Sequence, residues 1–137
     1  MGLILDSSIL IPAERQGKNA RQVMTEVGPR IGETAIALSV VTLIELAHGA
    51  ARADTPERKN RRLQFIQELL TAVPVYSVTP AVAIRAGEID GESQARGARI
   101  PLADLLIGVT ALDLGYGVAT ANPRHFRLIP GLSVVEL

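Results

Sequence analysis

Short apolar runs alternate with longer amphipathic segments along this 137-residue chain, and the alternation limits the folds that it can adopt. Apolar runs of this kind, separated by helical segments, are typical of strands buried in a parallel sheet. Because parallel strands are joined by helical crossovers, the pattern predicts a three-layer α/β/α fold with a mainly parallel central sheet. The predicted strands read LIL (3–5), AIAL (35–38), VPVYSV (73–78), GVAT (117–120) and LSVVEL (132–137).

Helix signals occupy the segments between these runs. A Thr-Pro pair stands at 55–56 and again at 79–80, and a capping hydroxyl followed by proline is a typical helix start. Gly115 follows the last apolar helical run, where glycine commonly ends a helix. The other predicted helices run from Ser7, over about 20–30, from Ser39 to roughly Arg52, and onward from Pro101.

The helix predicted after position 55 has an apolar side and a basic start. Its apolar residues recur every three to four positions, which predicts one buried face made of Leu63, Ile66, Leu69 and Leu70. The basic stretch RADTPERKNRRLQ (52–64) is interpreted as a solvated helix face. Its alternative interpretation is a surface that steers an RNA backbone.

Composition excludes several functional classes. The length suits a single domain, 1–137, and the absence of cysteine excludes disulfides, thiolate metal sites and a cysteine nucleophile. Fourteen basic residues balance fourteen acidic ones, so the net charge does not indicate a nucleic-acid partner. No segment approaches the ~18 apolar residues of a membrane span, and Asp6 interrupts a first apolar run that is unlike a signal peptide. We therefore expect a cytoplasmic protein with no membrane partner.

Three carboxylates are predicted to meet at one edge of the sheet. Asp6 follows the first strand, Glu45 lies in the helix after the second, and Asp104 lies in the first turn after Pro101. The carboxyl ends of parallel strands open on the same edge, where ligands of such folds bind. Clustered carboxylates repel unless a proton or cation neutralises them, and Mg²⁺ or Mn²⁺ prefers oxygen ligands. The pattern indicates phosphodiester hydrolysis by a metal-activated water.

Each of these acidic residues also has a simpler interpretation. Asp6 is placed to cap the next helix, Asp104 to interact with a helix dipole, and Glu45 to lie on a solvated helix surface. His48 shares a helix side with Glu45, but neither His48 nor His125 has a carboxylate partner evident from spacing. We therefore assign both histidines to surface or packing roles.

The chain resembles the PIN-domain family, and in particular the toxin ribonucleases of VapBC-type toxin–antitoxin modules. The segments that carry the resemblance are LILDSSIL (3–10), LSVVTLIELAHGA (38–50) and the block from Ile100 to Leu137. It implies an α/β/α fold and an endoribonuclease that cleaves RNA to 5′-phosphate and 3′-hydroxyl ends. It also implies a homodimer and a cognate antitoxin whose tail enters or covers the acidic groove.

By this resemblance, Asp6, Glu45 and Asp104 would hold the Mg²⁺ or Mn²⁺ ion. Many members carry a fourth acidic residue where this chain has Asn122, an uncharged amide that is able to coordinate an ion or orient a water. Asn122 in place of an acidic residue makes a second metal site less expected, and it argues less against nuclease activity.

Two hydroxyl side chains are expected to support the acidic site, and two other functional classes are alternatives. Ser7 and Thr120 are candidates for supporting hydrogen bonds to a carboxylate or a phosphate. The alternative function is a non-catalytic PIN-like module that binds RNA or protein. A receiver-like signalling domain fits less well, because Asp6 has no adjacent acid and the only lysines are Lys18 and Lys59.

Overall fold

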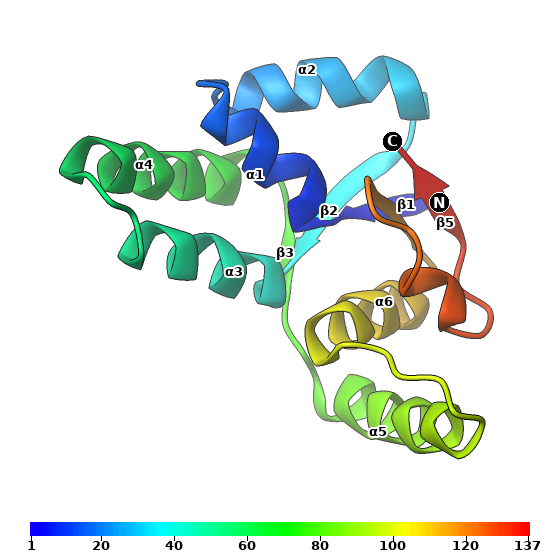
Figure 1. Ribbon diagram of the computed structural model, residues 1–137. Coiled ribbons are helices and arrows are strands. Elements are labelled where there is room, and N and C mark those ends of the chain that lie inside the picture. The colour runs from blue at the N-terminus through cyan, green and yellow to red at the C-terminus, as the bar shows by residue number, and fades with distance from the viewer.

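Five strands form one parallel sheet in the computed structural model, which describes residues 1–137 (Figure 1). Their order across the sheet is β3-β2-β1-β4-β5. The strands are β1 (Gly2–Leu5), β2 (Ala35–Ser39), β3 (Val75–Tyr76), β4 (Gly117–Thr120) and β5 (Val134–Glu136).

Six α-helices connect the strands and cover both faces of the sheet, so the predicted three-layer α/β/α fold is confirmed (Figure 1). The hydroxyls of Ser39, Thr55 and Thr79 each accept a backbone N–H hydrogen bond at the predicted helix starts. None of the helices is long and apolar enough to cross a membrane. The helices are α1 (Ser7–Arg15), α2 (Ala20–Ile31), α3 (Val40–Ala51), α4 (Pro56–Ala72), α5 (Pro80–Ala95) and α6 (Leu102–Leu114), with a 3-10 helix η1 (Phe126–Leu128).

The central strand β1 separates two apolar cores. Leu3 and Leu5 pack in a core with residues of α1, α2 and α4. Ile4 lies in the opposite core, which α5, α6 and η1 fill. Because side chains alternate across a strand, a three-residue apolar run buries both faces at once. The run LIL therefore encodes a strand at the centre of the sheet.

The strand order reverses its direction between β1 and β4. From β1 the chain adds β2 and β3 on one side of the sheet, and β4 and β5 lie on the other side. The Asp6 N–H donates to the Ala119 carbonyl at 2.9 Å, which ties the carboxyl ends of β1 and β4 together. Ligands of open parallel sheets bind at the carboxyl ends beside such a reversal.

Two predicted strands are longer than the observed ones. The third prediction, 73–78, reduces to Val75–Tyr76, because α4 extends to Ala72 and Pro74 has no N–H to donate to a neighbouring strand. The last prediction, 132–137, reduces to Val134–Glu136. Here the Leu132 N–H donates to the Ile129 carbonyl within a turn, so the strand begins later.

The predicted buried face of α4 is wrong in part. Leu63 and Leu70 are 42% and 45% exposed, while Phe65 and Leu69 are buried. The inner stripe of α4 consists of Arg62, Phe65 and Leu69. The apolar pattern failed here because a charged residue occupies an inner position.

Arg62 occupies that position because it has a buried partner on α1. Its Nε donates to Oε1 of Glu14 at 3.1 Å, and both side chains are 8% exposed. Its Nη1 also donates to the Leu46 carbonyl of α3, and a Cβ added at Gly49 would collide with the same guanidinium. Arg62 therefore joins α1, α3 and α4. The prediction that it lies on a solvated helix face is wrong.

Candidate active site

Asp6 is buried where β1 passes into α1, and two hydroxyls hold its carboxylate. Ser8 donates to Oδ2 at 2.7 Å, and Thr120 at the end of β4 donates to the same oxygen at 2.8 Å. Asp6 occupies the N-cap position of α1, but its side chain accepts no capping hydrogen bond. The capping interpretation is therefore wrong. The carboxylate is oriented across the sheet edge, and Oδ1 takes part in neither hydrogen bond.

The two hydroxyls also organise the backbone that leaves β4. Ser8 Oγ accepts the Ala121 N–H at 3.0 Å, and Thr120 Oγ1 accepts the Asn122 N–H at 3.0 Å. Asn122 is exposed beside the strand end, and its side-chain amide makes no hydrogen bond within the protein. Sequence reasoning missed Ser8, although a hydroxyl two residues after an aspartate is well placed for a local hydrogen bond.

Glu45 lies in α3, which contacts α1 and α6 and passes beside the strand ends (Figure 1). Burial raises the pKa of the Glu45 carboxyl, the nearby Ser7 hydroxyl opposes this rise, and Asp6 and Asp104 add to it. Its Oε1 is buried and has no hydrogen-bond partner. Glu45 is therefore not an ordinary solvated helix residue.

Asp104 lies in the first turn of α6 and completes the acidic group. Burial raises the pKa of its carboxyl, Asp6 raises it further, and His125 opposes the rise. His125 Nδ1 lies 3.1 Å from Asp104 Oδ2. The surface or packing role assigned to His125 is therefore wrong. The two residues stand 21 positions apart, and only the loop after β4 brings them together.

The three carboxylates supply the oxygen ligands that a hard divalent cation prefers, but their present positions do not form a complete coordination site. They are close enough for Asp6 to raise the pKa values of Glu45 and Asp104. No three acidic or histidine side chains are close enough to hold one ion as they stand. The unpartnered Oε1 of Glu45 is a buried oxygen that a hard cation could take as a ligand. Binding would require the side chains to draw together.

The raised pKa of Glu45 predicts a pH-dependent effect of Glu45→Gln on stability. A raised folded-state pKa means that the carboxyl contributes stability at acid pH, and that this contribution is lost as the pH rises through that pKa. Glutamine is neutral at every pH, so the variant does not lose this stability as the pH rises. Without metal, Glu45→Gln should match the wild-type melting temperature near about pH 4 and exceed it near about pH 7.

Thermal melts in chelating buffer check this prediction. The matched control is Glu88→Gln, which changes an exposed glutamate of α5 and should shift melting little at either pH. An equal difference between wild type and Glu45→Gln at both pH values would contradict the electrostatic origin.

Known proteins share both the sequence pattern and the fold. Residues 3–132 match the PIN domain. The chain is 30% identical over 137 residues to Ribonuclease VapC1 of Rickettsia felis, covering all of this chain and 97% of that protein. It is also 30% identical over 99 residues to the tRNA(fMet)-specific endonuclease VapC of Salmonella typhimurium, covering 72% of this chain and 73% of that protein.

A solved structure has the same architecture. The crystal structure of VapBC2 from Rickettsia felis bound to a promoter DNA fragment aligns with a TM-score of 0.82. It covers 100% of this chain and 99% of that chain at 22% identity, so it bears on the fold alone. The chain belongs to the PIN-domain family, as the sequence resemblance predicts. Within that family its relatives are VapC ribonucleases, and the chain is a member of the VapC type.

Proposed function

We propose that the protein is an endoribonuclease that hydrolyses RNA phosphodiester bonds as the toxin of a toxin–antitoxin pair. The observation that carries the proposal is the gathering of Asp6, Glu45 and Asp104 at the strand reversal, where two of the carboxyls have raised pKa values. Such a group at this edge suits a divalent cation and a phosphate. Relatives named as VapC ribonucleases support the same activity.

Mg²⁺ or Mn²⁺ would be held by Asp6, Glu45 and Asp104. When bound, the ion would lower the pKa of the attacking water and stabilise charge on the reacting phosphate. Ser8 and Thr120 would keep Asp6 Oδ2 in place and leave Oδ1 for the ion.

Two further side chains would act beside these carboxylates. His125 would orient Asp104 through its hydrogen bond to Oδ2. Asn122, exposed at the end of β4, would orient the water or the phosphate through its amide, with one negative charge fewer than a carboxylate would bring.

The biological setting is part of the same proposal. A cognate antitoxin would cover the acidic site, and an antitoxin arginine would compete with the metal; solved structures of VapBC complexes share this fold. The protein would act as a homodimer in the cytoplasm. One relative is named a tRNA(fMet)-specific endonuclease, so initiator tRNA is the first RNA to test.

Cleavage of RNA by the purified protein, freed of its antitoxin, tests the proposal. Total cellular RNA and initiator tRNA are incubated with Mg²⁺, with Mn²⁺ or with a chelator, and the product ends are mapped. We expect internal cleavage only with metal, leaving 5′-phosphate and 3′-hydroxyl ends. Cleavage that persists in chelator would contradict the metal's role.

A non-catalytic PIN-like binding module is the second candidate function. It is favoured by Asn122 in place of an acid and by the lack of a preformed three-ligand cluster. It predicts RNA or protein binding with no cleavage under any metal condition.

His125→Ala is expected to weaken Mn²⁺ binding and RNA cleavage by about 10- to 100-fold, as is typical when the partner of a metal-binding side chain is lost. The cause is a freely rotating Asp104 carboxylate. Calorimetric Mn²⁺ titration and kcat/KM measurements check it. His125→Asn retains a donor and should recover part of both losses. Unchanged Mn²⁺ affinity in His125→Ala would reject a positioning role.

A further inference from the structure

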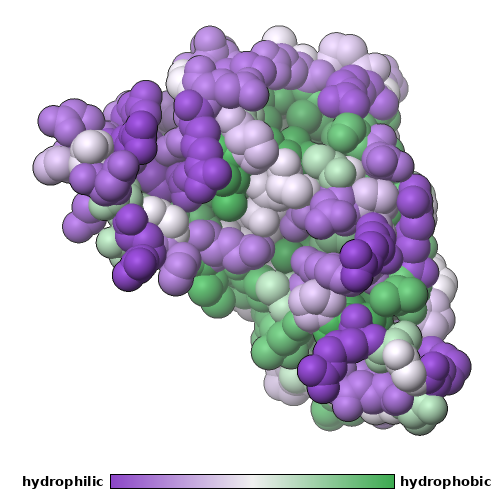
Figure 2. Space-filling view, viewed as in Figure 1, coloured by the Kyte–Doolittle hydropathy of each residue, from purple (hydrophilic) through white to green (hydrophobic).

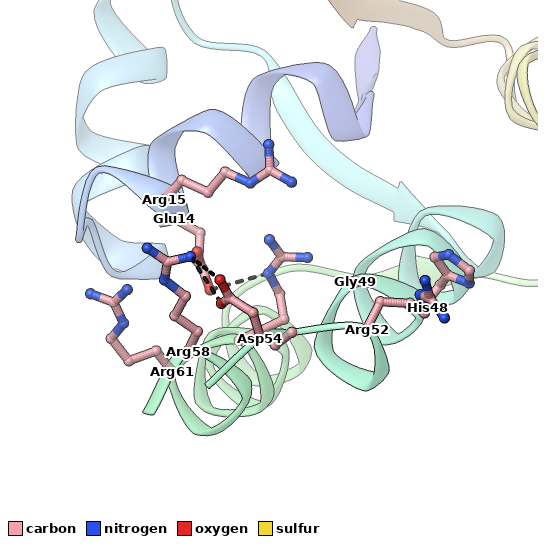
Figure 3. A pocket seen from close by; sticks show the side chains of 10 residues that line it. Glu14, Arg15, His48, Gly49, Arg52, Asp54, Arg58 and Arg61 are labelled. Atoms are coloured by element: carbon pink, nitrogen blue, oxygen red, sulfur yellow. Dashed lines mark hydrogen bonds and ion pairs between the residues drawn. The ribbon is translucent and has the colours of Figure 1, made fainter. Parts of the chain in front are cut away.

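Positive charge is concentrated in one hollow of a protein that is neutral overall. Fourteen basic and fourteen acidic residues cancel over the whole chain. A hollow of about 660 Å³ between the end of α1, the end of α3 and the start of α4 is lined by five arginines and only two carboxylates (Figure 3). We call this hollow the arginine pocket, and its arginines are Arg15, Arg52, Arg58, Arg61 and Arg62. Figure 2 shows hydrophilic side chains gathered over this part of the surface, at the left of the view.

Both carboxylates of the arginine pocket are already occupied. Glu14 pairs with the buried Arg62, and Asp54 accepts two hydrogen bonds from Arg58 at 2.9 and 3.0 Å. The other three guanidiniums are exposed and make no ion pair or side-chain hydrogen bond; they are Arg15, Arg52 and Arg61. They lie at the end of α1, at the C-cap of α3 and in α4, so the fold holds three unneutralised charges around one space. Like charges gathered in this way favour binding of a multivalent anion.

The lining of the arginine pocket favours phosphate over peptide. Of its ten residues, Ala53 alone is apolar, none is a Phe, Tyr or Trp, and His48 carries the one aromatic ring. Protein interfaces depend on apolar and aromatic anchors that fill pockets, which this lining cannot receive. With His48 as its one ring, the lining offers no platform of aromatic side chains on which successive bases could stack. Guanidinium groups instead match the oxygens of phosphate in geometry and charge. The recognised part of the ligand would be a nucleic-acid backbone, read without regard to base sequence.

The arginine pocket lies at the C-terminal ends of α1 and α3, the two helices that also run past the acidic site. Helix α1 begins beside Asp6 and ends at Arg15, and α3 carries Glu45 and ends just before Arg52, its C-cap residue. Arg52 follows Glu45 by seven residues, about two helical turns, so it lies at the end of α3 on the side of Glu45 and about 10 Å further along the axis. Helices α1 and α3 contact one another, so both run between the two places.

We propose that the arginine pocket binds backbone phosphates of the RNA strand whose phosphodiester bond lies at Asp6, Glu45 and Asp104. This inference rests on the proposed function, because it assigns the substrate's second contact. The pocket holds the strand a few nucleotides from the cleaved bond. It supplies affinity for RNA of any sequence, and the acidic site supplies the chemistry.

Direct RNA binding by the full chain tests the proposal. A fluorescent single-stranded RNA of roughly twelve nucleotides is titrated in chelator at several salt concentrations. The test variant is Arg15→Gln/Arg52→Gln/Arg61→Gln, which leaves both ion pairs of the pocket intact. The matched control is Arg85→Gln/Arg96→Gln/Arg99→Gln, which removes three exposed arginines on and just after α5, across the sheet. A polyglutamate peptide replaces the RNA in a parallel titration.

The pocket variant is expected to bind RNA about tenfold more weakly, because each phosphate contact adds modest affinity. The slope of log affinity against log salt should fall by about 2, since each contact in a single strand contributes about 0.7. The control variant should behave as wild type, and all three proteins should melt alike. If wild type binds RNA through the pocket and cleaves none, the proposed function fails, and the pocket remains an RNA-phosphate site of a protein that binds RNA without cleaving it.

Three results would overturn the inference. The first is unchanged RNA affinity and salt slope in the pocket variant. The second is an equal loss in the control variant, which would show that any three arginines suffice. The third is loss of polyglutamate binding with RNA binding retained, which would assign the pocket to an acidic protein segment.

Discussion

Asp104→Asn is expected to lower kcat/KM for RNA cleavage by about 100- to 1,000-fold. Metal stabilisation of a reacting phosphate is worth several kcal/mol, and each 1.36 kcal/mol is a factor of ten. The substitution keeps the size of the side chain and removes its charge. Because burial and Asp6 raise the pKa of Asp104, its ionised form is unfavourable in the metal-free fold. The variant should therefore melt no lower than wild type in chelator.

The matched control for Asp104→Asn is Asp113→Asn. Asp113 lies nine residues further along α6 and is exposed, so its substitution makes the same chemical change away from the acidic site. Rates are measured on the same RNA with saturating Mn²⁺, and Mn²⁺ affinity is measured separately. Wild-type kcat/KM in Asp104→Asn would remove Asp104 from the proposed site, whatever the result for Asp6→Asn.

Arg62→Ala is expected to destabilise the fold by about 3–5 kcal/mol, because it leaves Glu14 charged and buried without its partner. The loss also removes the hydrogen bond to the Leu46 carbonyl, so α1, α3 and α4 lose a shared contact. Urea unfolding at neutral pH measures the effect. Melting should fall by roughly 10 °C or more for a domain of this size.

Two comparisons identify the buried pair as the cause. Arg58→Ala breaks a pair with Asp54 whose side chains are 62% and 70% exposed, and it should cost less than about 1 kcal/mol. Glu14→Gln/Arg62→Met removes both charges and should be more stable than Arg62→Ala. If Arg62→Ala and Arg58→Ala unfold at the same urea concentration, burial does not determine the value of the Arg62 pair.

Features that depend on neighbouring residues were predictable from the sequence. The run LIL marks β1 as a strand buried on both faces, and Ser39, Thr55 and Thr79 cap helices within three residues of themselves. Alternation of strands and helices predicts the parallel α/β/α fold. These signals act within one strand or one helical turn, where residues that are close in the sequence are also close in space.

Features that depend on packing between distant segments were not predictable. The leucines of α4 suggest a buried face at Leu63 and Leu70, yet Arg62 is the inner residue because Glu14, 48 positions earlier, lies opposite. His125 resembled a surface residue until the loop after β4 placed it on Asp104. No local sequence pattern predicts such a pairing, because the order of strands in the sheet determines which distant residues come into contact.

The amino-acid sequence by itself therefore determined the class of fold and the elements on which the acidic residues lie, since burial and helix capping are local preferences. Only the tertiary structure decided how those residues are held. Thr120 reaches Asp6 across 114 positions because β4 pairs with β1, and Ser8 completes the contact from the first turn of α1. The same folding gathers the unpaired Arg15, Arg52 and Arg61 around one hollow. The physical reason is that charge and hydrogen bonding act through space, and the sheet order determines which distant residues become neighbours.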